Sequence, residues 1–158
     1  MESMKKILIV EDDRDINELI AYNLVKQGFE VTSVYDGTEA KETLQLEYFD
    51  IVILDIMLPG VDGFHICKSI KENPAAFKTF VVMLTARTES QDKIYGNLVG
   101  ADCYITKPFS LNKLMGIIEE LIMIRGGEHF VQNNNLIYST KRKIENEEKD
   151  CALTGGGV

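Results

Sequence analysis

Side chains that could carry out chemistry together follow four short apolar runs of the sequence. They are, in chain order, Glu11, Asp12, Asp13, Asp55, Thr85 and Lys107. Carboxylates that met in one pocket would repel one another unless a cation lay between them. Hard oxygen ligands with open positions suit Mg²⁺ (or Mn²⁺), which keeps several waters and also binds phosphate oxygens. These residue types therefore indicate a divalent-cation site.

Phosphoryl transfer is the chemistry that such a site would support. The carboxylate of Asp55 could act as a nucleophile, since aspartate forms acyl phosphates. The cation, the Lys107 ammonium and the Thr85 hydroxyl would then bind the negative oxygens of the transferred group. The sequence has the parts for in-line transfer to a carboxylate.

Each of these signals has a purely structural alternative. An acid after a strand is often a helix N-cap, and for Asp13 alone this is the favoured interpretation. A lone acid at the end of a buried strand is more often structural, and Lys-Pro before a helix is a common turn. Their joint appearance, in order, at four strand ends favours the functional interpretation.

The elements that must position these residues alternate along the chain. Five apolar runs that suit strands covered on both faces are Ile7–Val10, Val31–Tyr35, Ile51–Leu54, Phe80–Leu84 and Cys103–Thr106. Five stretches with helical spacing follow them, at about 16–25, 38–47, 64–71, 89–99 and 111–125. Five β-α repeats predict a doubly wound α/β fold, (βα)5, with a five-stranded parallel sheet. The carboxyl ends of its strands would form the ligand edge.

Length and composition fit one domain with a short appendage. The chain has 158 residues, of which 45% are hydrophobic, and a formal net charge of -8. That charge disfavours a nucleic-acid surface. Three cysteines without a CxxC pair favour a reducing compartment. With no apolar run of about 18 residues and no signal-peptide pattern, we expect a cytoplasmic protein that makes no membrane contact.

Four segments resemble the signature segments of response-regulator receiver domains. They are Ile-Leu-Ile-Val-Glu-Asp-Asp at 7–13, Ile-Val-Ile-Leu-Asp-Ile-Met-Leu-Pro-Gly at 51–60, Leu-Thr-Ala at 84–86 and Gly-Ala-Asp-Cys-Tyr-Ile-Thr-Lys-Pro-Phe at 100–109. The resemblance covers about residues 4–125 and implies a flavodoxin/CheY-like sheet of order 2-1-3-4-5.

The resemblance also implies a role for each site residue. The divalent metal would be held by Glu11, Asp12, Asp55 and the backbone carbonyl of Met57. Asp55 would be the phosphoacceptor, with Thr85 and Lys107 binding the phosphoryl oxygens. Tyr104 would be the switch aromatic that moves inward with Thr85, and the Lys107–Pro108 bond would be cis. The donor would be a phosphohistidine on a sensor histidine kinase. Such a receiver catalyses only its own phosphorylation and dephosphorylation and is not a turnover enzyme.

Residues 126–158 differ from the 1–125 receiver region. Short strand-like runs around a charged loop end in Leu153-Thr154, which resembles the opening of the winged-helix output domain of OmpR/PhoB-type regulators. The alternative is a disordered tail, or one introduced by cloning. We find no recognition helix in the sequence, so we expect no nucleic-acid contact from this chain as given.

A homodimer of the OmpR/PhoB kind would pair the faces formed by the fourth helix, fifth strand and fifth helix. Lys93 and Asp102 match its ionic set, but Cys103 and Ile117 stand where a further acid and an arginine are expected. We therefore expect such a dimer to use apolar contacts of three residues on the last helix, Met115, Ile117 and Leu121.

Three functions follow from this sequence. The first is the input half of a DNA-binding transcription regulator that responds to phosphorylation of Asp55. The second is a stand-alone receiver that signals by protein contact. The third, a metal-dependent phosphatase with an aspartyl nucleophile, is disfavoured because Met57 stands where such enzymes usually carry a second acid.

Overall fold

The computed structural model describes residues 3–76, 78–85 and 100–126. Its elements are β1 (Lys6–Val10), α1 (Arg14–Lys26), β2 (Glu30–Val34), α2 (Gly37–Leu46), β3 (Ile51–Asp55), α3 (Gly63–Glu72), β4 (Phe80–Thr85), β5 (Cys103–Thr106) and α5 (Leu111–Gly126). The helix expected over 89–99, with Lys93, lies outside the described residues. So does the tail beyond 126.

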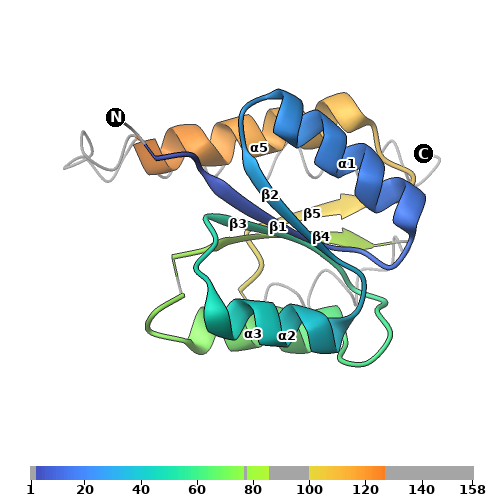
Figure 1. The fold of residues 1–158 in the computed structure, drawn as a ribbon, viewed down its shortest axis with the longest axis vertical. Coiled ribbons are helices and arrows are strands. Elements are labelled where there is room, and N and C mark those ends of the chain that lie inside the picture. Colours follow the sequence, from blue (N-terminus) through green and yellow to red (C-terminus); the bar gives the residue numbers. More distant parts are fainter. Residues whose placement is uncertain (1–2, 77, 86–99, 127–158) are drawn as a thin grey trace.

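The five strands form one parallel sheet in the order β2-β1-β3-β4-β5, which confirms the predicted fold (Figure 1). β3 lies in the middle, paired with β1 on one side and β4 on the other. Because all strands run the same way, their carboxyl ends lie at one edge of the sheet.

Helices cover both faces of the sheet, and this explains the apolar runs. Ile7 and Ile9 of β1 belong to a core cluster with residues of α1 and α5. Leu8 and Val10 belong to a second cluster, with residues of α2 and α3. Figure 1 shows these two helix layers above and below the strands. Successive side chains of a strand point to opposite faces, so a strand buried on both sides must be apolar throughout.

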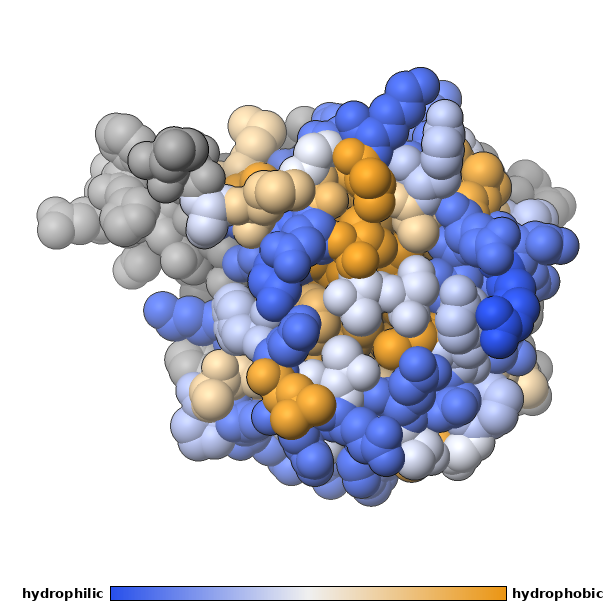
Figure 2. Space-filling model, viewed as in Figure 1, coloured by the Kyte–Doolittle hydropathy of each residue, from blue (hydrophilic) through white to orange (hydrophobic). Residues whose placement is uncertain are grey.

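The edge strand β2 is less buried than the central strands. Its burial rises from exposed Glu30 to buried Val34, whereas every residue of β3 is buried. Figure 2 shows apolar residues in the middle of the face on this side, framed by hydrophilic ones. Across residues 3–76, 78–85 and 100–126, no helix combines the length and apolar character that crossing a bilayer requires.

Local signals in the sequence fix the helix ends. Asp13, Asp36 and Asp62 are the N-caps of α1, α2 and α3, and their carboxylates accept hydrogen bonds from backbone N–H groups of the first turn. Gly28, just beyond α1, has a φ of 96°, a conformation that favours glycine. The N-cap interpretation of Asp13 is confirmed.

Three apolar side chains of α5 that were expected at a dimer interface face the core instead. Ile117 is 0%, Leu121 2% and Met115 7% exposed, and all three pack in the cluster between α5 and the sheet. A dimer could not use them without unpacking that cluster, so the apolar contacts predicted for it are wrong. The helical spacing of these residues reflects core packing.

Asp102 takes part in a polar cluster within the chain. Lys71 Nζ donates to Asp102 Oδ2 at 2.7 Å and to the Thr79 carbonyl at 2.7 Å. The same Asp102 oxygen accepts the Val81 N–H at 2.8 Å. The side chains of Lys71 and Asp102 are 19% and 14% exposed, so water screens this ion pair only in part. It ties α3 to the start of β4 and β5.

We predict that Asp102→Asn lowers the free energy of unfolding by about 1–3 kcal/mol, the range for a hydrogen bond to a charged group. Lys71→Met should cost a similar amount, and the double variant should cost less than the sum because the two residues interact. Urea unfolding measures all three. Lys68→Met, an exposed change on the same helix, is the control and should stay within about 0.5 kcal/mol. Additive losses would show that the two side chains do not stabilise the fold through their interaction with each other.

Candidate phosphoacceptor site

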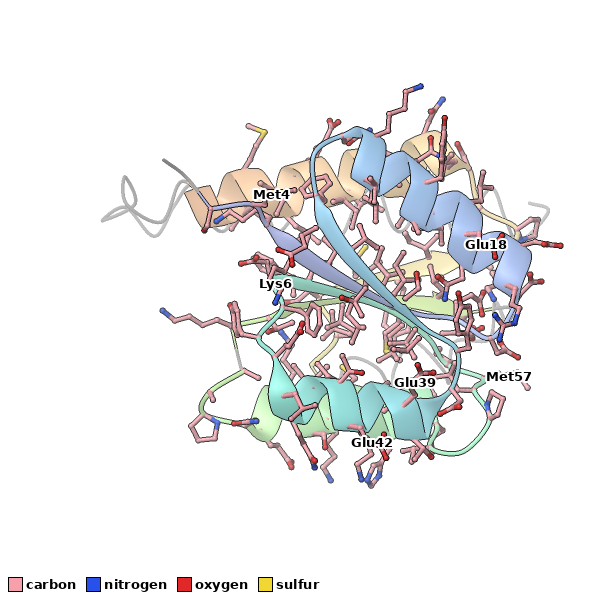
Figure 3. All side chains as sticks on the ribbon, in the orientation of Figure 1. Met4, Lys6, Glu18, Glu39, Glu42 and Met57 are labelled. Carbon is pink, nitrogen blue, oxygen red and sulfur yellow. The ribbon has the colours of Figure 1, made fainter. Side chains whose placement is uncertain are left out.

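The predicted site residues lie together at the carboxyl edge of the sheet. Glu11 and Asp12 follow β1, Asp55 ends β3, Thr85 ends β4, and Lys107 follows β5. In Figure 3, Met57 marks this end of the molecule, while Met4 and Lys6 lie at the opposite end. Segments far apart in sequence therefore supply one site, as the strand-end argument predicted.

Three carboxylates form the centre of the site. One oxygen of each of Glu11, Asp12 and Asp55 lies within 4.8 Å of the others. Glu11 is 0% and Asp55 5% exposed, whereas Asp12 is exposed. The cluster is buried on one side and open to solvent on the side of Asp12.

Lys107 supplies the positive charge of this cluster. Its Nζ donates hydrogen bonds to Glu11 Oε1 and, at 2.9 Å, to Asp55 Oδ2. The other oxygen of Asp55, Oδ1, accepts the Met57 N–H at 2.9 Å. Two donors on different segments thus orient the Asp55 carboxylate. The Lys107–Pro108 peptide bond is cis, as the resemblance implied.

Burial and like charge shift the protonation of Glu11. Burial raises the pKa of this carboxyl, and the neighbouring Asp55 raises it further, to about 8, although Lys107 acts in the opposite direction. Burial alone would lower the pKa of the Lys107 ammonium, but its hydrogen bonds to Glu11 and Asp55 outweigh burial, and the net change is a rise. The site therefore keeps Lys107 charged and has excess negative charge.

A cavity of about 450 Å³ adjoins the cluster. Asp12 and Thr85 line it, together with Ile56, Met57, Leu58, Pro59, Asp62 and Phe64. Asp55 is not among the lining residues, and its two oxygens accept hydrogen bonds from Lys107 and the Met57 N–H. The space for an incoming group lies between the β3–α3 loop and the end of β4.

Two predicted switch residues are buried. Thr85 is 2% exposed, at the rim of the cavity. Tyr104 is 3% exposed and packs in the core cluster on the α2–α3 side. The structure thus places Tyr104 inside, on the strand next to the one that carries Thr85.

Two further residues at this edge, Asp62 and Asn17, were not predicted from the sequence. Asp62 lines the cavity and caps α3, and its position before Gly63 and a helical stretch was the available signal. Asn17 is a fully buried polar residue in α1, and its place on the apolar side of that helix was the signal.

A family model described as "Response regulator receiver domain" matches residues 7–119. The chain belongs to the response regulator receiver family. Receivers are regulatory domains of two-component systems that bind Mg²⁺ at an acidic pocket and accept phosphoryl groups from histidine kinases. This chain has an acidic cluster, formed by Glu11, Asp12 and Asp55.

Individual relatives support the OmpR/PhoB subfamily. The receiver is 40% identical over 119 residues to the phosphate regulon transcriptional regulatory protein PhoB of Rhizobium meliloti (strain 1021), a match that covers 75% of this chain and 52% of PhoB. The chain thus spans about half the length of that relative. Thermotoga maritima DrrB, an OmpR/PhoB homologue, is 33% identical with a TM-score of 0.69, over 77% of this chain and 54% of DrrB. Chemotaxis response regulator CheY4 of Vibrio cholerae is 31% identical with a TM-score of 0.71, over 75% of this chain and 99% of CheY4.

We predict that the metal-free receiver loses stability as pH rises, because of Glu11. Its pKa is about 8 in the folded protein and near 4.5 in the unfolded chain, so the folded state binds the extra proton. The resulting stability is complete below pH 4.5 and is lost as pH rises through 8. Glu11→Gln, which cannot ionise, should unfold at a higher temperature than wild type at about pH 9, by about 4 °C or more, and the difference should shrink at about pH 5.

Thermal unfolding in a chelator tests this prediction. Glu119→Gln, a change at an exposed glutamate of α5, is the control and should leave the pH profile unaltered. A Glu11→Gln advantage of equal size at both pH values would show that ionisation of Glu11 is not the cause.

Proposed function

We propose that this receiver accepts a phosphoryl group on Asp55 from a sensor histidine kinase, in a reaction that depends on Mg²⁺. The observation that supports this proposal is the meeting of Glu11, Asp12 and Asp55 within 4.8 Å, with Lys107 bonded to two of them. The proposed switch in conformation then controls an output, and the similarity to PhoB favours transcription.

The residues present fit a divalent cation. When all three carboxyl groups are ionised, one ammonium leaves two negative charges without compensation, and all the ligand atoms are hard oxygens. The metal would be held by Glu11, Asp12, Asp55 and the backbone carbonyl of Met57. When bound, Mg²⁺ (or Mn²⁺) would neutralise these carboxylates and the phosphoryl oxygens.

The residues of the chain itself would divide the remaining work. A carboxylate oxygen of Asp55 would form the new bond to phosphorus while the phosphorus–nitrogen bond of the donor histidine breaks, and the imidazole would leave with the electron pair. Lys107 would move from Asp55 Oδ2 to an oxygen of the transferred group and so keep its ion pair. The Thr85 hydroxyl, at the cavity rim, would donate to another of these oxygens.

The proposed switch depends on Thr85 and Tyr104. Movement of Thr85 toward the phosphoryl group would change the packing at the end of β4. Tyr104, on the adjacent strand and buried, would be held in its inward position by that change. The alternative output, signalling by protein contact without DNA, would use the same site and the same switch.

We predict that acetyl phosphate with Mg²⁺ gives one phosphoryl adduct on the wild-type protein, seen by intact mass, and none on Asp55→Asn. A chelator should abolish the adduct, because the repulsion at the site would no longer be compensated. Asp15→Asn, an exposed acid in the first turn of α1 outside the cluster, is the matched control and should keep the adduct. A phosphoryl adduct that persists in Asp55→Asn would show that Asp55 is not the phosphoacceptor.

A homodimer through the fourth helix, β5 and α5 is a further part of the proposal. Within the described part of α5, the exposed side chains are Asn112, Glu119 and Met123, and Met123 is 73% exposed. We predict that beryllofluoride with Mg²⁺ raises the sedimentation coefficient of the wild type and that Met123→Glu weakens this effect. Leu46→Glu, at an apolar residue of α2 that is 84% exposed, is the control. Equal loss in both variants would argue against the α5 face.

A further inference from the structure

Asn17 is a buried polar side chain of α1 that the proposed chemistry leaves without a role. It is 0% exposed and shares the buried face of the helix with Ile20 and Leu24. A polar group at such a position weakens the core unless its hydrogen bonds are satisfied. Its contacts therefore indicate what it does.

The side-chain amide of Asn17 joins two strand ends. Its Nδ2 donates to the Glu11 carbonyl at 3.0 Å and to the Val34 carbonyl at 3.0 Å. Because both acceptors are carbonyl oxygens, only the NH₂ group can lie between them, and Oδ1 must point away. That oxygen is buried and has no hydrogen-bond partner among the described residues. An apolar side chain would leave no such unsatisfied oxygen in the core.

The two contacts fix the backbone that carries the metal ligands. The Glu11 N–H donates to the Val34 carbonyl at 3.2 Å, so Glu11 is held through its N–H and, by Asn17, through its carbonyl. That carbonyl belongs to the peptide unit between Glu11 and Asp12. The orientation of this unit determines where the two acidic side chains leave the chain.

We propose that Asn17 is a positioning residue for the divalent-cation site. By fixing the Glu11–Asp12 peptide against the end of β2, it holds two mutually repelling carboxylates near Asp55 before the cation binds. The ligands are then already in place when the cation binds. Binding does not have to order the Glu11–Asp12 backbone, so the entropic cost of ordering it does not weaken the affinity for the cation. This inference rests on the proposed Mg²⁺ site.

Asn17→Leu and Asn17→Ala remove the two hydrogen bonds and test this role. Titration calorimetry of metal-free protein with Mg²⁺ should show a dissociation constant about tenfold higher in both, as for other groups that support a metal ligand. The phosphorylation rate with acetyl phosphate should need about tenfold more Mg²⁺ to reach half its maximum. At saturating Mg²⁺ the maximal rate should return to near the wild-type value, because the reacting groups themselves are unchanged.

Two control variants separate positioning from stability. Thr79→Val removes another buried side-chain-to-backbone bond, from Thr79 Oγ1 to the Phe49 carbonyl at 2.7 Å, at the opposite edge of the sheet. Asn23→Ala removes an asparagine amide of the same helix that donates to the Leu19 carbonyl at 2.8 Å in an exposed place. Both should bind Mg²⁺ as tightly as the wild type, even if Thr79→Val unfolds at a lower temperature.

A measurement on the unaltered protein covers the case in which the Asn17 variants do not fold. In nuclear magnetic resonance spectra, the Asn17 side-chain amide signals should shift during a Mg²⁺ titration with the dissociation constant found by calorimetry. The Asn23 amide signals should stay in place. Asn17 signals that do not respond would overturn the inference.

The outcomes also separate this inference from the proposed function. If the wild type binds no Mg²⁺ and takes no phosphoryl group, the proposed function fails. If the wild type does both, and the folded Asn17 variants bind Mg²⁺ within about twofold of it, only the positioning role of Asn17 is wrong.

Discussion

The ion pairs of Lys107 with Glu11 and Asp55 are the interaction on which the site depends. They compensate part of the repulsion among three carboxylates that the sheet brings within 4.8 Å of one another. Compensation is incomplete because one ammonium faces three carboxyl groups. Burial, and then the neighbouring Asp55, raise the pKa of Glu11. An excess of negative charge at a partly buried edge favours a divalent cation, and the same excess makes the metal-free site a source of instability.

The rest of the fold can be understood from the need to hold these like charges close together. A sheet covered on both faces is a rigid support, because each central strand packs side chains into both core clusters. Parallel strands place the ends of four chain segments at one edge of the sheet. Asn17 and the Met57 N–H then orient the carboxyl groups locally. Rigid strands and a few oriented hydrogen bonds together hold charges that would otherwise separate.

Two partly buried polar clusters in the described part of the chain have different effects. At the opposite edge, Lys71 and Asp102 form an ion pair whose charges balance. Its further hydrogen bonds run to the Thr79 carbonyl, just before β4, and to the Val81 N–H of β4. At the carboxyl edge the charges do not balance. An ion pair with balanced charges and satisfied hydrogen bonds stabilises the fold. A cluster with excess negative charge is less stable by itself and is stabilised when a cation neutralises it.

The sequence by itself determined the alternation of strands and helices, the N-cap at Asp13 and the set of residues at the strand ends, because these follow from local periodicity and from the direction of parallel strands. It did not determine that Ile117 faces the core, that Asp102 pairs with Lys71, or that Asn17 bridges Glu11 and Val34. The hydrogen bonds among them join residues 6 to 31 positions apart in the sequence. The burial of Ile117 depends on how α5 is rotated against the sheet. Only tertiary packing decides them, since burial and hydrogen-bond geometry are properties of the assembled chain.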